Sequence, residues 1–143
     1  MEISLLTEVT DEVVEAFTRL LPQLSSSAVI PTRSELQDIA DNDSFFIARD
    51  TDSGGRIVGS LTLVTFRIPT GVRSWIEDVV VETAMRGKGI GEALTRAALL
   101  RAAELGAKTV DLTSRPSREA ANRLYQRVGF ELRQTNLYRY DIK

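Results

Sequence analysis

The apolar residues of the chain recur at two spacings, and these divide it into helical and strand-like stretches. Apolar positions three and four residues apart indicate amphipathic helices, whereas short β-branched or alternating runs indicate strands. The helical spacing predicts helices over residues 10–21, 31–40, 89–105 and 116–128. The second pattern predicts strands over residues 3–6, 44–49, 57–68, 73–82, 108–114, 130–133 and 137–142.

The order of these elements favours one α+β domain over residues 1–143. Three strands follow one another between residues 44 and 82, with the turn signal Gly54-Gly55 after the first, and this predicts antiparallel pairing. No repeat, low-complexity tract or linker interrupts the chain. We expect a mixed, mostly antiparallel sheet of about seven strands, flanked by about four helices.

The most informative stretch begins with three valines at residues 79–81 and continues through Gly87, Gly89 and Gly91 into a helix. Backbone N–H groups converge at such a turn, and the helix dipole favours negative charge, so the arrangement is typical of an anion site. The alternative is a glycine-rich connection that binds nothing. Three alternating glycines are conformationally costly for a mere connection. The pattern therefore favours a phosphate ligand.

Two common nucleotide-binding patterns do not fit this turn. A P-loop needs a glycine, four further residues and then Gly-Lys-Ser or Gly-Lys-Thr. In the dinucleotide pattern Gly87 and Gly89 fit, but Glu92 occupies the third glycine position and no early βαβ unit precedes it. Nucleotide binding is thus disfavoured, and a pyrophosphate cradle flanked by Arg86 and Lys88 remains.

Composition narrows the chemistry available to such a site. The chain has no cysteine and no histidine, which excludes a thiol nucleophile, a thiolate metal site and the commonest general base. Its net charge of −2 creates no field that favours nucleic acid. No signal peptide or membrane-spanning stretch is visible. We expect a cytoplasmic protein without a metal, a nucleic-acid partner or a membrane partner.

Two motifs resemble those of the GNAT N-acetyltransferase superfamily. The first is Arg86-x-x-Gly89-x-Gly91, between an apolar strand and an amphipathic helix, which resembles the acetyl-CoA motif of that superfamily. The second is ANRLYQRVGF at residues 121–130, which resembles the A-x-x-L-Y-x-x-x-G-F helix and strand. The distance between the motifs and the order of the predicted elements also agree, so the resemblance covers essentially the whole chain.

The resemblance implies where acetyl-CoA binds. The strand before the turn would pair with the pantetheine arm where it splays from residues 108–114, and the turn would hold the pyrophosphate. Amides near Val79 or Val80 would polarise the thioester carbonyl. Many family members carry Asn where this chain has Arg118, so Arg118 either contacts CoA phosphates or faces solvent. The residues expected at acetyl-CoA are Val79, Val80, Val81, Arg86, Gly87, Lys88, Gly89, Ile90, Gly91, Glu92, Arg118 and Asn122.

The same resemblance implies the catalytic groups. Tyr125 would protonate the leaving thiolate, unless it is only a core residue packed against Phe130. Two adjacent acids, Glu77 and Asp78, interrupt an apolar strand, and one of them would take the proton of the amine, directly or through water. Strand geometry predicts that Glu77 shares a face with Val79. The alternative is a solvated carboxylate or a salt bridge to Arg73.

We therefore expect an enzyme that transfers an acetyl group from acetyl-CoA to a primary amine by direct attack. A small-molecule amine is the expected acceptor, and a protein N-terminus or lysine is the alternative. A non-catalytic acyl-CoA-binding or regulatory domain would share the turn but would need neither Tyr125 nor Glu77. The alternation in residues 137–142 would suit either a homodimer contact or an internal hairpin strand.

Overall fold

The computed structural model describes residues 1–142 and divides the chain into two compact units. The first unit is Met1–Thr113, and the second begins at Ser114. The expectation that residues 1–143 act as a single domain stays a prediction.

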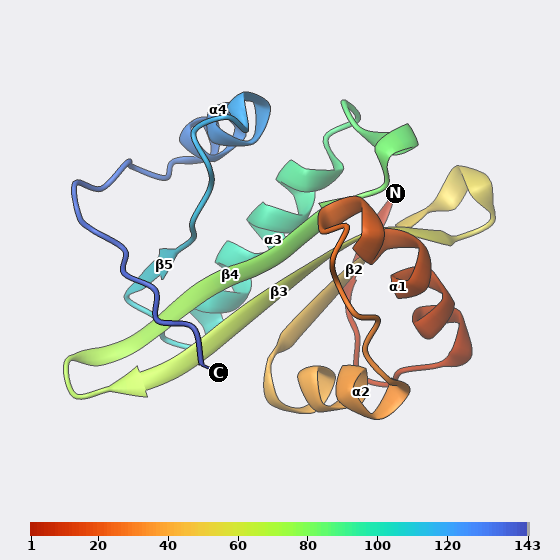
Figure 1. The fold of residues 1–143 in the computed structure, drawn as a ribbon, viewed down its shortest axis with the longest axis horizontal. Coiled ribbons are helices and arrows are strands. Elements are labelled where there is room, and N and C mark those ends of the chain that lie inside the picture. Colours follow the sequence, from red (N-terminus) through yellow and green to blue (C-terminus); the bar gives the residue numbers. More distant parts are fainter. Residues whose placement is uncertain (143) are drawn as a thin grey trace. The chain divides into compact units, whose positions relative to one another are not determined.

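The first unit is built on a mixed five-stranded sheet (Figure 1). Its strands are β1 (Glu2–Leu5), β2 (Ser44–Asp50), β3 (Arg56–Ile68), β4 (Gly71–Val81) and β5 (Thr109–Asp111). They lie side by side in sequence order. The pairs from β1 to β4 are antiparallel, whereas β5 pairs with β4 in parallel. The parallel step occurs where the chain crosses over through a helix, as parallel neighbours require.

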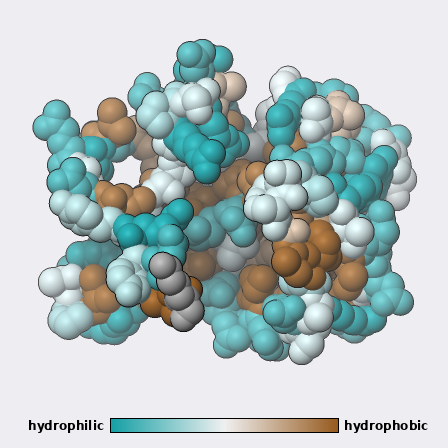
Figure 2. Space-filling view, viewed as in Figure 1, coloured by the Kyte–Doolittle hydropathy of each residue, from teal (hydrophilic) through white to brown (hydrophobic). Residues whose placement is uncertain are grey.

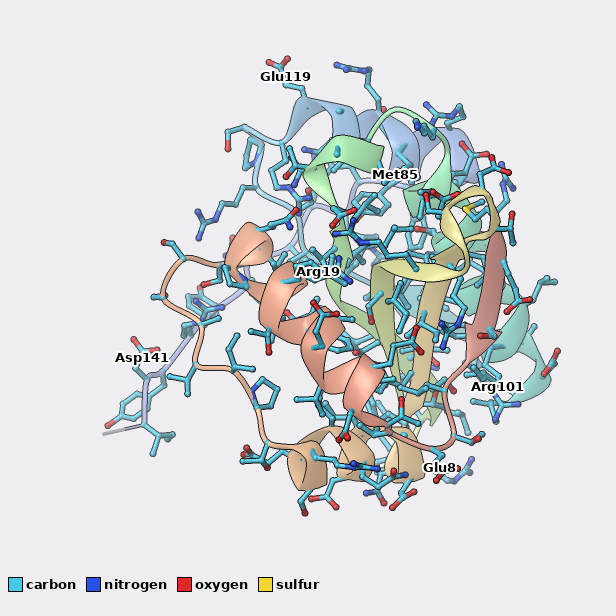
Figure 3. The ribbon with its side chains drawn as sticks, turned by 90° about the vertical axis from the view of Figure 1, so that its right-hand side faces the viewer. Glu8, Arg19, Met85, Arg101, Glu119 and Asp141 are labelled. Carbon is cyan, nitrogen blue, oxygen red and sulfur yellow. The ribbon has the colours of Figure 1, made fainter. Side chains whose placement is uncertain are left out.

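Helices cover both faces of this sheet (Figures 1 and 3). On one face lie α1 (Asp11–Leu24) and α2 (Arg33–Asn42), and on the other lies α3 (Ile90–Glu104). Alternation along β2 serves both faces, because Phe45 packs its ring 5.3 Å from that of Phe17 on α1, while the adjacent Ser44 accepts a hydrogen bond from Arg101 on α3.

Local signals account for the helix boundaries on the first face. At α2, the hydroxyl of Thr32 accepts from the amide of Glu35, whose carboxylate accepts from the amide of Thr32, a reciprocal capping box. The sequence predicts that Pro22 either ends or bends the first helix, and α1 continues through Pro22 to Leu24. Proline removes one N–H from the last turn without ending the helix.

The prediction of about seven strands is wrong for the described chain. The second unit contains α4 (Glu119–Val128), and the stretches 130–133 and 137–142 are not strands. Leu137, Tyr138, Tyr140 and Ile142 are all largely exposed. Figure 2 shows that hydrophobic residues, in brown, lie among hydrophilic ones on the face in view. An alternating pattern can form a strand only when a neighbouring backbone supplies hydrogen bonds and one face is buried. Residues 131–142 are all exposed and form no strand pair.

No helix within residues 1–142 is both long enough and apolar enough to cross a membrane.

Candidate functional site

The predicted anion turn connects β4 to α3 through a short 3₁₀ helix, η2 (Thr83–Met85). Gly87 and Gly89 have φ angles of 81° and 79°, in the left-handed region that favours glycine. An added Cβ would meet no atom within 4 Å at either position, so backbone conformation rather than crowding requires glycine there. Gly91 differs from them, because it lies inside the first turn of α3. The sequence placed three glycines in the turn, and the structure places two.

The end of the turn opens onto the N-terminus of α3. The first amides of a helix have no carbonyl one turn earlier to bond, and Gly89, at the N-cap, has no side chain to supply an acceptor. These amides and the helix dipole favour an anion at this place. The carboxylate of Glu92, in the first turn of α3, would repel an anion bound there. Arg96 donates a hydrogen bond to this carboxylate at 3.1 Å, which offsets part of the repulsion.

Arg86 and Lys88, which flank the first glycine of the turn, are both exposed. The ammonium of Lys88 lies 3.9 Å from the sulfur of Met85. The pKa of Asp50, the last residue of β2, is lowered mainly by a hydrogen bond from Ser53 and further by the charge of Lys88. Lys88 therefore lies within electrostatic reach of the β2–β3 turn as well as of its own turn.

A β-bulge interrupts β4 where the two acids stand. Thr62 pairs with Glu77 and Ser60 pairs with Val80, so Leu61 alone lies opposite both Asp78 and the residue after it. Asp78 has a φ angle of 50°, the conformation that glycine normally supplies in bulges of this kind. Aspartate tolerates it better than most residues. The bulge takes one residue out of the ladder with β3 and leaves its backbone groups available to another partner.

The bulge corrects the predicted orientation of Glu77. Because Thr62 and Ser60 share a face of β3, their partners Glu77 and Val80 also share a face. Simple alternation placed Glu77 with Val79 instead, and the inserted residue reverses that relation. Val80 belongs to the core cluster packed with α1, so Glu77 is on the sheet face that carries α1, with its side chain exposed. Asp78 is exposed too.

The expected splay beside β4 is present in the first unit. β5 pairs only with Arg73, Ser74 and Trp75 and then ends. From residue 76 to residue 81, the edge of β4 that faces away from β3 pairs with no other strand of the sheet. Such an edge presents backbone N–H and C=O groups to an extended ligand. The bulge lies within this open edge, and the glycine turn follows it on the same continuous stretch of chain.

The second unit contains the predicted acid, Tyr125, on α4. Its ring packs edge-on against Phe130, with centroids 5.8 Å apart and an interplanar angle of 70°. Burial raises the pKa of Tyr125, and the nearby positive charge of Arg118 lowers it by less. The aromatic packing that the sequence offered as an alternative is therefore present. It does not exclude proton donation, because a raised pKa keeps the phenol protonated at neutral pH.

The two other residues expected at the cofactor in this unit differ in how they are held. Arg118 is the exposed N-cap residue of α4. The side-chain amide of Asn122 donates to the carbonyls of Arg115 and Arg118, both at 2.9 Å. Asn122 thus fixes the loop that enters α4, a role that its place on the helix did not indicate.

Five residues that meet at the entry to the turn were missed by the sequence analysis. Glu82, just after β4, accepts hydrogen bonds from Arg19 and Arg56, and Thr83 donates to Gln23. No local signal could reveal these contacts, because Arg19 precedes Glu82 by 63 residues and Gln23 precedes Thr83 by 60.

Within residues 1–142, no three acidic side chains lie together in a way that could hold a metal ion.

The chain is similar in fold to solved acetyltransferases along nearly its whole length. An acetyltransferase of Trypanosoma brucei is 28% identical, with 99% of each chain covered and a TM-score of 0.77. An aminoglycoside acetyltransferase from an uncultured soil metagenomic sample is 23% identical over 99% of this chain and 96% of that chain, with a TM-score of 0.82. Glucosamine-6-phosphate N-acetyltransferase of Arabidopsis thaliana is 21% identical over 97% of each chain, with a TM-score of 0.80.

No curated protein matches the sequence significantly. The family comparison is decisive by contrast, because the profile of the acetyltransferase (GNAT) family matches residues 6–130, which include both motifs, most of the first unit and α4 of the second. The chain therefore belongs to the acetyltransferase (GNAT) family.

Proposed function

We propose that this protein transfers an acetyl group from acetyl-CoA to a primary amine. One observation carries the proposal: an open strand edge runs directly into a glycine turn at a helix N-terminus. Acetyl-CoA has matching parts, an extended amide-bearing pantetheine arm followed by a pyrophosphate. Backbone pairing suits the first part, and converging amides suit the second.

In this proposal β4 and the turn bind the cofactor largely through their backbone. Val79, Val80 and Val81 pair with the pantetheine arm, and the bulge offers an amide to the thioester carbonyl. The amides of residues 87–91 hold the pyrophosphate, with Arg86 and Lys88 adding positive charge. Support comes from the exposure of residues 86–89 and from the glycine conformations.

The reaction needs one proton removed and one proton supplied. The amine nitrogen attacks the thioester carbon, so that a C–N bond forms and the C–S bond breaks. Glu77, or Asp78 or a water held by either, takes the proton of the amine, and Tyr125 gives its proton to the sulfur. Burial raises the pKa of Tyr125. Exclusion of water also raises the pKa of the leaving thiol, because it disfavours the thiolate. The two pKa values therefore move in the same direction.

We propose a small-molecule amine rather than a protein as the acceptor. The aminoglycoside and glucosamine-6-phosphate enzymes of similar fold are named for small amino sugars. Glu77 and Asp78 are exposed carboxylates, and a cationic amine complements them. We further propose that residues 1–143 act as one catalytic domain in the cytoplasm.

The test is CoA release from acetyl-CoA over a panel that contains amino sugars, polyamines, amino acids, and peptides with free N-termini or lysines. We expect turnover with at least one small amine, and a large loss in Tyr125→Phe. Turnover with peptides alone would overturn the small-molecule acceptor. CoA binding without turnover on any amine would instead support a non-catalytic acyl-CoA-binding or regulatory domain.

A further inference from the structure

Two arginines from different elements converge on Glu82, the first residue after β4. Arg19 of α1, marked in Figure 3, donates from Nη1 to Oε1 of Glu82 at 2.8 Å. Arg56, at the start of β3, donates from Nη2 to the same oxygen at 2.7 Å. The side chain of Glu82 is only 12% exposed, and its backbone amide donates to the carbonyl of Val58. Charge-assisted hydrogen bonds that are shielded from water are among the stronger ones in a protein.

The next residue, Thr83, is bound by the same helix. Its amide and its hydroxyl donate to Oε1 of Gln23 at 2.8 and 3.0 Å. The amide group of Gln23 in turn donates to the carbonyl of Arg19 at 3.1 Å. The last two turns of α1 thus bind two consecutive residues at the point where the chain enters the glycine turn.

The guanidinium of Arg19 donates hydrogen bonds to three different acceptors. Besides Glu82, it donates from Nε to Glu15 at 3.2 Å and from Nη2 to the carbonyl of Ile57 at 3.1 Å. A planar fork bound in this way has a fixed orientation, which a lysine ammonium would not have. α1, β3 and the end of β4 are therefore joined at one point.

We infer that Arg19 and Gln23 are positioning residues, which act through Glu82 and Thr83 to aim the amides of the turn at the pyrophosphate of acetyl-CoA. The turn is fixed at its exit by α3, where the amide of Ala93 bonds Gly89. At its entry it depends on the contacts with Glu82 and Thr83. Amides serve an anion only when they point to one place, so a displaced entry weakens binding without removing any group that touches the ligand. This inference rests on the proposed function.

The chain offers a matched control. Arg49 donates to both carboxylate oxygens of Glu12, at 2.9 and 3.0 Å, and to the carbonyl of Gly55 at 2.9 Å. It thus joins α1 to the sheet with the same chemistry as Arg19. None of these contacts is with residues 82–92. Arg49→Met removes a similar ion pair without touching the entry to the turn.

The experiment measures the dissociation constants of CoA and of pantetheine, which lacks the pyrophosphate, by NMR titration of the full chain. We expect Arg19→Met to weaken CoA about tenfold, or about 1.4 kcal/mol, and to leave pantetheine within about twofold. Arg49→Met should leave both constants near those of the wild type. Thermal unfolding of each variant shows whether a change in affinity follows a general loss of stability.

A second pair of variants keeps the test decisive if Arg19→Met does not fold. Thr83→Ser retains the hydroxyl donor to Gln23, and Thr83→Val removes it with little change in shape. We expect normal CoA affinity in the first and a several-fold loss in the second. If wild type binds CoA but the Arg19 or Thr83→Val variant weakens it no more than its control, or weakens pantetheine equally, the positioning role is overturned and the proposed function stands. If wild type binds no CoA, both fail.

Discussion

The segment from β4 to α3 presents backbone groups, whereas α4 presents a side chain. In the first, the open edge, the bulge at Asp78 and the left-handed glycines place N–H and C=O groups, and the side chains matter mainly for the path of the chain. In the second, the phenol of Tyr125 is the group of interest, on a helix whose own contact is with Phe130. Apart from the two acids at the bulge, Glu77 and Asp78, substitutions in the first segment should therefore change binding of the cofactor, and substitutions in the second should change the chemical step.

The largest effect is expected at Tyr125. Tyr125→Phe keeps the ring against Phe130 but removes the proton donor, so kcat should fall by about 10²- to 10³-fold while the KM for acetyl-CoA changes little. Steady-state kinetics on the best acceptor of the panel measures both. Tyr140→Phe is the matched control, because Tyr140 is almost fully exposed. Equal activity of wild type and Tyr125→Phe would leave the tyrosine only its packing role.

A smaller loss is expected at the bulge. Glu77→Gln removes a carboxylate and keeps its shape, so kcat/KM for the amine should fall by about 10- to 100-fold if Glu77 is the base. The loss should shrink at higher pH, where more of the amine is already deprotonated. Asp78→Asn is the comparison, and a larger loss there would transfer the role to Asp78. A pH–rate profile of both variants distinguishes them.

A change confined to cofactor binding is expected at the turn. Gly89→Ala forces a Cβ into a φ of 79°, at a cost of about 1–2 kcal/mol, and should raise the KM for acetyl-CoA about tenfold with kcat nearly unchanged. Gly106 also has a φ of 79° and open space around it, but it follows α3. Gly106→Ala should lower stability similarly without changing KM. A rise in KM in both variants would mean that strain alone, and not the turn, affects binding.

The smallest effect concerns pH and stability. Burial raises the pKa of Tyr125 in the folded protein, so the folded state holds this proton more tightly than the unfolded state does. Its contribution to stability is present below the unfolded pKa of about 10 and is lost as pH rises through the folded value. Urea unfolding at pH 9 and pH 11 should show a steeper loss in wild type than in Tyr125→Phe. Equal losses of unfolding free energy in the two proteins would mean that folding does not shift the pKa of Tyr125.

The contrast between the two segments extends to how well the sequence predicted them. β4, the turn and α3 follow local rules, since a β-branched run, left-handed glycines and an amphipathic repeat each act within a few residues. The same rules found α4 but failed for residues 130–142. There the alternation was real, yet a strand depends on a partner that alternation cannot specify.

Within the candidate site, the misses share one cause. Glu77 was placed on the wrong face because a single inserted residue at Asp78 reverses alternation, and only pairing with β3 reveals it. Arg19 and Gln23 were invisible as partners of Glu82 and Thr83, because about 60 residues separate them in the chain. Polar residues on a helix indicate an exposed face equally well whether or not they bind a distant loop.

The sequence by itself determined the family, the order of the elements through α4, and the strand–glycine–helix stretch, because these depend on neighbours along the chain. Tertiary structure decided on which face of the sheet Glu77 lies, the length of the open edge beside β4 and the number of strands. It also decided the hydrogen bonds between α1 and the entry to the turn. Each of these depends on which backbones pair and which side chains meet across the fold. Hydrogen bonds between distant segments fix those choices, and no local pattern encodes them.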